Sequence, residues 1–530
     1  MKNIDPNFTK HLPKITLDYL NNGASIKFFF NRYNSIENYF DQIEEKKNNY
    51  DNSYRKPLCD VLKSSYNNVK ENSFQINAIK RLANENTFTI TTGHQLNLFT
   101  GPLYFFYKII DTINICKKLT SKYPQYNFIP VYWMASEDHD FKEIKFFNSN
   151  NTLFDWNIST KGTVGDLETQ SLTKVFDKLV NCFGTENINS KNLIDLFNKS
   201  YIKNKKLSDA TFNLVHNLFG KHGLLIINPD NSKLKQIFSK EIIDEIINEN
   251  CFKNVSHTNK NLKKIGFNPQ VNPRHINLFY LKKNKRSRIF KENSIYKVFE
   301  TNISFTKSQI IDEVNNYPER FSPNVLFRPF FQEKILPNLG YVGGGSEIAY
   351  WLQLRSFFDK KNITFPMLIV RNSVLLMSKK NIKKCEKLDL NIPDLFKKTD
   401  NLIKSHISKK TDYSIDFTKL KKVISSNFIK LYKAANKTDK SFIGALKAQE
   451  VKQLKGLTHL EKRFMKAQKI KHKDEIERIK ALKHVLFPNN SLQEREINFS
   501  EFYKDYGEDF INILKSNLKP FVNKFIIISL

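Results

Sequence analysis

The stretch FTITTGHQLNLFTGPLYFFYKIIDTINICKKLTSKYPQYNFIPVYWMASEDHD, residues 88–140, decides the fold. Its first five residues, 88–92, are aromatic or β-branched and predict a buried strand. A helix is expected to follow, with Thr100 as its cap and Pro102 in its first turn. A second apolar run, 128–133, predicts another strand, which ends in the polar residues 136–140. This order defines a β-α-β unit, whose two polar loops both leave the carboxyl ends of parallel strands.

These two loops are the first candidates for a binding site, because ligands of open α/β sheets occupy the crevice at that edge. Backbone N–H groups and the positive end of the helix dipole are expected to point at an anion above Gly101. The loop Ser136-Glu137-Asp138-His139-Asp140 offers three carboxylates and an imidazole, any of which could serve as a base. The structural alternatives are a solvated turn for this loop and an ordinary turn for Gly93-His94-Gln95.

Length and composition restrict the class of protein. A chain of 530 residues with 40% apolar residues supports a real core and roughly two to four folded units. The formal net charge of +32 comes from scattered lysines, so it indicates anionic small ligands more than nucleic acid. Five widely spaced cysteines suggest neither a zinc site nor a disulfide framework, and no metal site is evident. Without a signal peptide or a membrane-length apolar run, we expect a cytoplasmic protein that does not enter a membrane.

Further strands extend the predicted sheet. Residues 223–230 predict a second β-α unit, and residues 365–370 and 373–377 are predicted to be the last core strands. Residues 274–281 and 287–290 predict an inserted hairpin, joined by a basic turn from Lys282 to Arg286. Arg274 and His275 at its start are either ligand contacts or ordinary polar residues at a strand end.

A glycine-rich segment forms the second informative stretch. The short strand 340–342 runs into Gly343-Gly344-Gly345, where a backbone without side chains can approach a ligand closely. Ser346 is expected to cap the following helix, with Glu347 in its first turn. The segment is not a Walker A loop, because no Gly-Lys-Ser/Thr follows, and a purely structural turn is the alternative. With the loop at Gly93–Gly101, it predicts one crevice in which both loops bind anionic groups.

The C-terminal third predicts long helices. Residues 394–487 contain no proline, and from Phe442 to Leu486 apolar residues recur at three- and four-residue spacings. That pattern is typical of a long amphipathic helix or a coiled-coil pair with a lysine-rich, solvated face. Because such a helix is too exposed to be stable alone, we expect a homodimer through residues 439–487.

Taken together, these motifs resemble the family of bacillithiol biosynthesis cysteine-adding enzymes, which are cysteine ligases. The matching segments, in chain order, are Thr92-Gly93-His94-Gln95, Leu98 to Tyr104, Trp133 to Phe141, Asn277 to Tyr280, Arg328-Pro329 with Glu333, Tyr341 to Trp351, and Leu486 to Arg495. This chain has Gly93-His94-Gln95 where the family often has Gly-Gln-Gln. It has Gly343-Gly344-Gly345-Ser346-Glu347 where the family often has Gly-Gly-Pro-Gly-Glu.

The resemblance implies an α/β fold: a Rossmann-like parallel-sheet core related to class I nucleotidyltransferases, inserted connective subdomains, and a C-terminal coiled coil that pairs two chains. It also implies the last step of bacillithiol synthesis, which joins the carboxylate of cysteine to the amine of glucosaminyl-malate. Activating a free carboxylate suggests ATP as co-substrate, by way of an acyl-adenylate or an acyl-phosphate. A base must keep the attacking amine neutral.

The candidate catalytic residues are Glu137, Asp138, His139 and Asp140. The residues predicted to bind substrate or nucleotide are Thr92, Gly93, His94, Gln95, Thr100, Gly101, Lys108, Arg328, Tyr341, Gly343, Gly344, Gly345, Glu347 and Tyr350. The predicted divisions are 1–87 for an N-terminal extension of the core, 88–150 for its first half, 151–325 for a further β-α unit with inserted subdomains, 326–393 for the second half with the glycine-rich loop, 394–490 for the coiled coil, and 491–530 for a C-terminal helix and tail.

The alternative function is a basic nucleic-acid-binding protein related to the class I synthetases. The high positive charge of the chain favours this alternative. However, the sequence shows no basic cluster interleaved with aromatic residues and no recognised RNA module.

Overall fold

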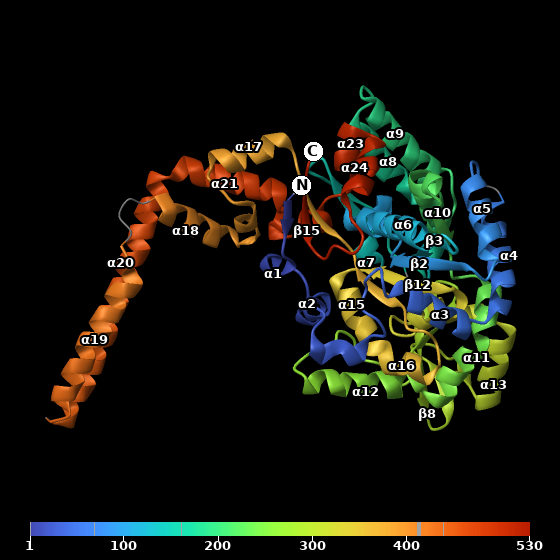
Figure 1. Ribbon diagram of the computed structural model, residues 1–530, viewed down its shortest axis with the longest axis horizontal. Helices are drawn as coiled ribbons and strands as arrows, with labels where there is room; N and C mark the ends of the chain where they lie inside the picture. The colour runs from blue at the N-terminus through green and yellow to red at the C-terminus, as the bar shows by residue number, and fades with distance from the viewer. Residues whose placement is uncertain (1, 68, 161, 411–414, 438) are drawn as a thin grey trace. The chain divides into compact units, whose positions relative to one another are not determined.

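The computed structural model describes residues 2–67, 69–160, 162–410, 415–437 and 439–530. The chain divides into two compact units. The first comprises Met1–Leu375 and Gln493–Ile528, and the second comprises Leu376–Leu492 and Ser529–Leu530. Parallel strands form the centre of the first unit, and long helices dominate the second (Figure 1).

A five-stranded parallel sheet organises the first unit. Its strands are β2 (Thr87–His94), β3 (Asn127–Met134), β6 (Leu225–Ile227), β12 (Asn338–Gly343) and β13 (Met367–Val370), in the spatial order β13-β12-β2-β3-β6. Every neighbouring pair is parallel, which confirms the predicted Rossmann-like α/β class. The strand order reverses between β2 and β12, and this switch point is where such sheets hold ligands.

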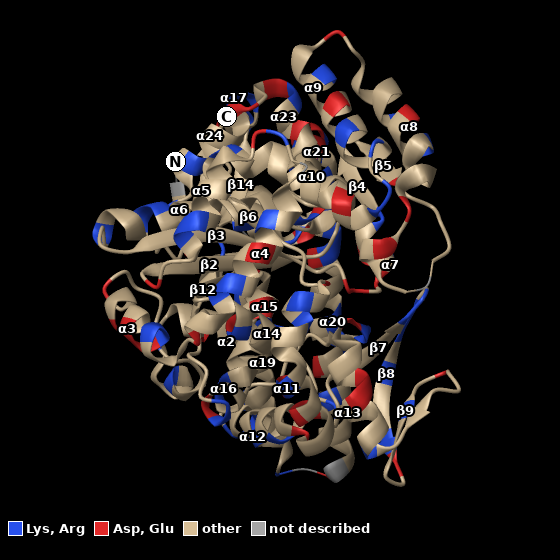
Figure 2. Ribbon diagram, turned by 90° about the vertical axis from the view of Figure 1, so that its right-hand side faces the viewer, with Lys and Arg blue, Asp and Glu red and all other residues tan. Residues whose placement is uncertain are grey.

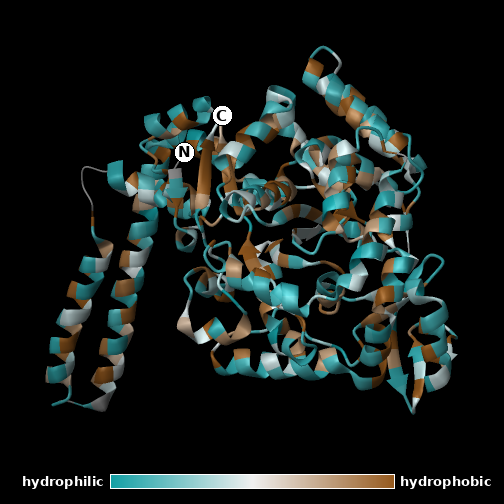
Figure 3. Cartoon of the chain, turned by 45° about the vertical axis from the view of Figure 1, so that its right-hand side comes forward, coloured by the Kyte–Doolittle hydropathy of each residue, from teal (hydrophilic) through white to brown (hydrophobic). Residues whose placement is uncertain are grey.

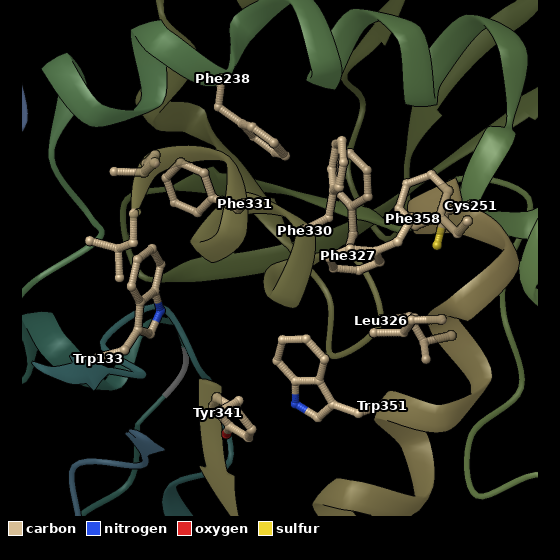
Figure 4. Packing of buried hydrophobic residues seen from close by; sticks show 14 of the residues in the cluster. Trp133, Phe238, Cys251, Leu326, Phe327, Phe330, Phe331, Tyr341, Trp351 and Phe358 are labelled. Carbon is tan, nitrogen blue, oxygen red and sulfur yellow. The ribbon is translucent and has the colours of Figure 1, made fainter. Parts of the chain in front are cut away.

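Helices pack on both faces of this sheet. Strand β2 is buried at every residue, as expected for a parallel sheet that is covered on both sides. Successive strand residues point to opposite faces, so the neighbours Tyr132 and Trp133 enter different packing regions. Tyr132 contacts Phe105 of α6 (Tyr104–Lys122), with ring centroids 5.3 Å apart. Trp133 contacts Phe331, which in turn packs on Phe238 of α11 (Ser232–Asn248); Figure 4 shows these three rings in the core.

The remaining helices of this unit surround the sheet and carry its insertions. They include α1 (Pro6–Thr9), α2 (Lys14–Leu20), α3 (Tyr39–Asn49), α4 (Arg55–Tyr66), α5 (Ser73–Leu82), α7 (Phe141–Ile144), α8 (Thr173–Phe183), α9 (Ile188–Phe197), α10 (Leu207–Phe219), α12 (Asn250–Lys264), α13 (Lys307–Asn316), α14 (Arg328–Ile335), α15 (Gly345–Trp351), α16 (Arg355–Lys360), α22 (Gln493–Glu496), α23 (Ser500–Tyr506) and α24 (Asp509–Asn517). A small hairpin, β4 (Phe146–Ser149) with β5 (Thr152–Asp155), follows α7.

The predicted inserted hairpin belongs to a five-stranded antiparallel sheet. Its members are β7 (Leu278–Lys282), β8 (Lys285–Glu292), β9 (Ile295–Val298), β10 (Ser304–Phe305) and β11 (Phe321–Pro323), in the order β10-β9-β8-β7-β11. The expected turn from Lys282 to Arg286 is wrong in length, because only Lys283 and Asn284 separate the strands. Asn284 has a φ of 60°, a left-handed conformation that asparagine tolerates in turns. Arg286 therefore lies within β8, opposite Leu281.

One predicted core strand belongs elsewhere. Strand β14 (Ser373–Met377) pairs with β15 (Phe525–Ser529), which pairs with β1 (Lys2–Ile4) in a separate three-stranded sheet. The prediction that residues 373–377 complete the core sheet is wrong. Just before β14, Asp111 of α6 accepts hydrogen bonds from the backbone N–H and the side chain of Asn372, both at 2.6 Å. These bonds hold the chain at the point where it leaves the sheet.

The second unit contains α17 (Lys379–Lys387), α18 (Thr399–Lys410), α19 (Phe417–Ala435), α20 (Lys440–Lys471) and α21 (Lys473–Leu486). Helices α19 and α20 lie antiparallel, around a small core of Phe428, Ala435 and Leu446 (Figure 3). The predicted long amphipathic pattern is thus confirmed as helix, with an interruption at His472. Residues 411–414 and 438 of the predicted coiled coil lie outside the described residues.

Candidate active site

A cavity of about 510 Å³ opens at the carboxyl edge of the parallel sheet, at the switch point between β2 and β12. The predicted site residues that line it are Gly93, His94, Gln95, Lys108, Glu137, Asp138, His139, Arg328, Tyr341, Glu347 and Tyr350. Thr92, Thr100, Gly101, Asp140, Gly343, Gly344 and Gly345 are not among the lining residues. The structure thus brings the loops after β2, β3 and β12 together around one space.

A partly buried ion pair joins β2, α6 and α15 at this cavity. Lys108 lies 2.6 Å from Glu347 and donates a hydrogen bond to the carbonyl of Gly93 at 2.7 Å. Glu347 also accepts hydrogen bonds from the Tyr341 hydroxyl at 2.7 Å and from the Gly344 N–H at 3.2 Å. Burial alone would raise the pKa of Glu347, but Lys108 and these donors outweigh it, so the pKa of the carboxyl is lowered.

Arg328 and two tyrosines continue this polar wall. The Arg328 guanidinium donates to Gln332 at 3.0 Å and lies 5.7 Å from the centre of the Tyr341 ring. Burial would lower the pKa of Arg328, but nearby Tyr350 and Tyr341 and a hydrogen bond with Tyr350 raise it. Burial likewise raises the pKa of both Tyr341 and Tyr350, so both phenols stay protonated near neutrality. This wall therefore offers ligands a fixed cation and neutral hydroxyl groups.

The loop after β3 forms the opposite wall, and its four candidate catalytic residues lie in different surroundings. Glu137 forms a buried ion pair with Lys235 of α11. Asp138 accepts a hydrogen bond from Gln95 at 2.9 Å and one from the backbone N–H of His139 at 2.7 Å. Although burial would raise it, the pKa of Asp138 lies well below its usual range because of these bonds and of nearby Arg286. Asp140, the fourth, is exposed beside α7 and does not line the cavity.

The inserted antiparallel sheet supplies cationic side chains that the sequence analysis did not select as site residues. Arg286 of β8 and Arg274 both lie against the ring of Phe279, at 3.9 and 5.8 Å, and all three line the cavity. Arg274 had been noted as a candidate ligand contact, whereas Arg286 was assigned to a turn. Figure 2 shows the basic residues along β8. Only the register of β8 brings Arg286 to the cavity, and no local sequence signal indicates it.

His94 ends strand β2 in a buried, aromatic environment. Its ring contacts Tyr104 and Phe105, with centroids 5.4 and 5.0 Å away. Burial, with Lys108 and Arg371 nearby, lowers the pKa of His94 well below its ordinary value, so the ring is neutral. Its Nε2 atom has no hydrogen-bond partner among the described residues, although the residue lines the cavity. His94 is thus a neutral ring at the cavity wall, and its unpaired Nε2 atom is itself buried.

The predicted anion site at Gly101 is not supported by the backbone. Helix α6 starts at Tyr104, with Leu103 as its N-cap rather than Thr100. Thr100 has a φ of 69°, and its N–H and that of Gly101 donate to Asn97 and Leu98 carbonyls. The expectation of free N–H groups above Gly101 is therefore wrong. A second contact explains why: Asn498, far along the chain, donates to the Gly101 carbonyl at 2.5 Å and holds this loop against the C-terminal segment.

The glycine-rich loop also differs in detail from the prediction. Gly344, and not Ser346, is the N-cap of α15, and its φ of −73° is open to any residue. Gly345 is the more crowded position, because a Cβ atom there would lie 2.6 Å from the end of the Leu12 side chain and 3.0 Å from Pro13, so these neighbours would have to shift. Thr92, buried in β2, donates to the Val342 carbonyl at 2.8 Å and so ties β2 to β12. In the structure, Gly345 and Thr92 support the cavity from behind rather than line it.

Other lining residues had not been predicted. They are Tyr104, Trp133, Met134, Ala135, Glu143, Pro229, Val271, Asn272, Phe279, Pro323, Asn324, Val325 and Phe331, together with Arg274 and Arg286. Five of them lie within the family motifs given above and could have been inferred from these: Tyr104, Trp133, Met134, Ala135 and Phe279. Among the described residues, no cluster of His, Cys, Asp and Glu is arranged to hold a metal ion. The helices in the described part of the chain are too short or too polar to cross a membrane.

The fold and the cavity define a Rossmann-like protein with a polar cavity at the switch point of its sheet, the position at which such sheets hold ligands. Residues 1–372 match the family described as bacillithiol biosynthesis BshC, N-terminal Rossmann-like domain, and residues 374–530 match its C-terminal coiled-coil domain. The chain belongs to this bacillithiol biosynthesis BshC family, which confirms the resemblance seen in its motifs.

Close relatives extend over the whole chain and carry one name, "Putative cysteine ligase BshC". The protein from Christiangramia forsetii is 49% identical over 98% of this chain and 97% of its own length. The one from Flavobacterium johnsoniae is 49% identical over 98% of both chains. A more distant relative from Cytophaga hutchinsonii is 33% identical over 97% of this chain and 95% of its own. These names favour the ligase interpretation over the nucleic-acid-binding alternative.

Proposed function

We propose that this chain is a cysteine ligase of bacillithiol biosynthesis, which forms an amide bond between the carboxylate of cysteine and the amine of glucosaminyl-malate. This is the last step of the pathway. The observation that carries the proposal is the match of both BshC domains across residues 1–372 and 374–530. A cavity of about 510 Å³ at the switch point lies within the size range of small-molecule sites, which supports it.

We propose ATP as the co-substrate, because a free carboxylate must be activated before an amine can displace one of its oxygens. ATP would supply a phosphate- or adenylate-bearing leaving group. The cavity contains cations suited to such a ligand: Arg328, whose pKa is raised, and Arg274. The Arg274 guanidinium makes no hydrogen bond or ion pair within the described residues, so its charge is available to an anionic group. A relationship of the core to class I nucleotidyltransferases would agree with this role for ATP.

The loop after β3 is the proposed source of catalytic groups. The attacking amine must be neutral, so a base or a suitably placed acceptor is required. Glu137, Asp138 and His139 line the cavity, and Asp140 remains a candidate only if ligand binding moves its loop. Lys108, Glu347 and Tyr341, which line the cavity, would bind and orient the substrates from the opposite side.

One reaction tests the activity directly. Pure protein is incubated with cysteine, glucosaminyl-malate and ATP, and the thiol product is detected by its mass. Parallel reactions omit ATP or replace it with another nucleoside triphosphate. A product that forms only with ATP supports the full proposal. Product formation without any nucleotide would refute the role of ATP alone, and failure to form product under every condition would refute the ligase assignment.

We also propose that the protein is a cytoplasmic homodimer whose chains associate through residues 439–487. Side chains left exposed on α20 support this, because Phe442, Val451, Leu460 and Ile470 are each 44–68% exposed within one chain. Burying such exposed apolar side chains against a second copy would be favourable. A reaction that consumes ATP also suits the cytoplasm. Light scattering that gives the mass of a single chain at micromolar concentration would refute the dimer.

A further inference from the structure

Arg286 makes an unusual contact with the candidate catalytic histidine. Its guanidinium NH1 lies 2.9 Å from Nδ1 of His139. Arg286 is itself held firmly: its side chain is only 7% exposed and lies flat over Phe279 at 3.9 Å. It also donates to the Ser322 hydroxyl at 3.2 Å and to the Pro323 carbonyl at 3.0 Å. With three contacts besides the histidine, Arg286 has little freedom to turn away from it.

The chemistry of the two groups determines which atom carries the hydrogen. A guanidinium has N–H donors and no acceptor, and it stays protonated in proteins. Within hydrogen-bond distance of it, Nδ1 of His139 must therefore be the acceptor and carry no proton. Asp138 is the only competing partner for Nδ1 among the described residues, but its Oδ1 lies 3.5 Å away. That oxygen already accepts the backbone N–H of His139 at 2.7 Å, so the shorter contact with Arg286 prevails.

We propose that Arg286 is a positioning residue that fixes His139 as the neutral tautomer with its proton on Nε2. The histidine then meets a ligand in the cavity as a hydrogen-bond donor. It cannot act as the base that takes a proton from the amine, because Nδ1 is occupied and Nε2 is already protonated. The inserted sheet therefore has a chemical function: it brings Arg286 from β8 to the loop after β3.

The tautomer itself does not depend on any activity, but its catalytic consequence rests on the proposed ligase function. In that reaction, an N–H donor at His139 would suit an oxygen that gains negative charge during attack on the activated carboxyl. The base would then come from a carboxylate of the same loop or from water. This divides the roles of the loop, since Asp138 accepts hydrogen bonds from Gln95 and from the backbone N–H of His139 and lies close to Arg286, which favour its ionised form.

Arg274 provides a matched control. It also lines the cavity and lies 5.8 Å from the centre of the Phe279 ring, so its loss likewise removes one positive charge from the cavity. It makes no contact with His139 among the described residues. Any effect on the histidine tautomer that arises from Arg286→Met but not from Arg274→Met must therefore come from the hydrogen bond rather than from general loss of charge.

The test uses the full-length, ligand-free protein labelled with ¹⁵N-histidine, so its outcome is independent of ligase activity. Long-range ¹H–¹⁵N spectra distinguish a protonated from an unprotonated ring nitrogen, and the signals of His139 are those that disappear in His139→Gln. The expected result is an unprotonated Nδ1 and a protonated Nε2 at neutral pH. A protonated Nδ1 in the parent protein would overturn the proposal, whatever the variants do.

In Arg286→Met, Nδ1 of His139 is expected to gain a proton, because Asp138 then becomes its nearest polar partner. Arg274→Met is expected to keep the parental pattern. If Arg286→Met folds and retains the unprotonated Nδ1, Arg286 does not fix the tautomer and the proposal fails. If that variant does not fold, Arg286→Gln offers a shorter polar side chain for the same measurement, and the spectrum of the parent protein still decides whether the tautomer assignment stands.

Discussion

Replacing Lys235 with Met is expected to destabilise the first unit strongly, because it leaves a carboxylate unpaired beneath the cavity. Lys235 of α11 is fully buried and forms an ion pair with Glu137, whose side chain is 10% exposed. Its ammonium also donates to the Phe321 carbonyl at 2.6 Å and lies 5.5 Å from the centre of the Phe331 ring. One lysine thus connects α11, the loop after β3 and the inserted sheet.

The size of the effect follows from this burial. Removing one partner of a buried ion pair typically costs about 3–5 kcal/mol, because the remaining charge is left without compensation. Glu137 borders the cavity and can be reached by water, so we expect a loss near the lower end, about 3 kcal/mol. Met retains most of the apolar stem, which keeps the cavity left behind small. Adding Glu137→Gln to Lys235→Met should recover about 1–2 kcal/mol, since the unpaired charge is then gone.

Urea unfolding followed by tryptophan fluorescence measures the free energy of unfolding of the first unit. Trp133, Trp156 and Trp351 are the only tryptophans, and all three belong to the first unit. Unfolding of the second unit therefore does not confuse the signal. The control is Lys233→Met, two residues away on the exposed side of α11, which should change stability by less than about 0.5 kcal/mol. The reasoning is refuted if Lys235→Met costs no more than this control, or if the double variant is less stable than Lys235→Met.

Three further results are expected. His139→Ala should lower turnover at least tenfold and leave the circular dichroism spectrum unchanged, since the side chain is half exposed; parental turnover in a folded variant would make the residue structural. Gly345→Ala should lower the melting temperature, at a cost of about 1–3 kcal/mol, because its Cβ would lie 2.6 Å from Leu12. Gly344→Ala should leave the melting temperature unchanged, because a Cβ atom there would lie 3.5 Å from Glu347, an ordinary contact distance. Equal melting temperatures for the two variants would contradict the packing argument. Burial raises the pKa of Asp111 to about 7, although the hydrogen bonds from Asn372 act to lower it. Because the folded pKa exceeds the unfolded one, of about 3.9, the stability linked to Asp111 is present below pH about 4 and is lost as the pH rises through about 7. Relative to Asp111→Asn, the parent protein should lose stability across that interval, and a constant difference between the two would show that Asp111 does not titrate there.

The strands of the core could be predicted because each of them is a short apolar run, which local composition reveals. The loops after β2, β3 and β12 could be inferred to meet, because parallel strands place their carboxyl ends at one edge. Local capping rules were less reliable. Thr100 and Ser346 have the residue types of helix caps, yet Leu103 and Gly344 occupy those positions. At the first of these places a distant residue, Asn498, holds the loop by a hydrogen bond to the Gly101 carbonyl and so outweighs local preference.

By itself, the sequence determined the Rossmann-like class, the family and the three loops that surround the cavity, because these depend on local patterns and on the order of strands. Only the tertiary structure decided which side chains face one another there. Lys108 meets Glu347 across 239 positions of sequence, and Arg286 reaches His139 across 147. Such contacts depend on strand register and helix packing, in which a shift of one residue turns a side chain to the opposite face. A pattern within a short stretch of sequence carries no information about that register.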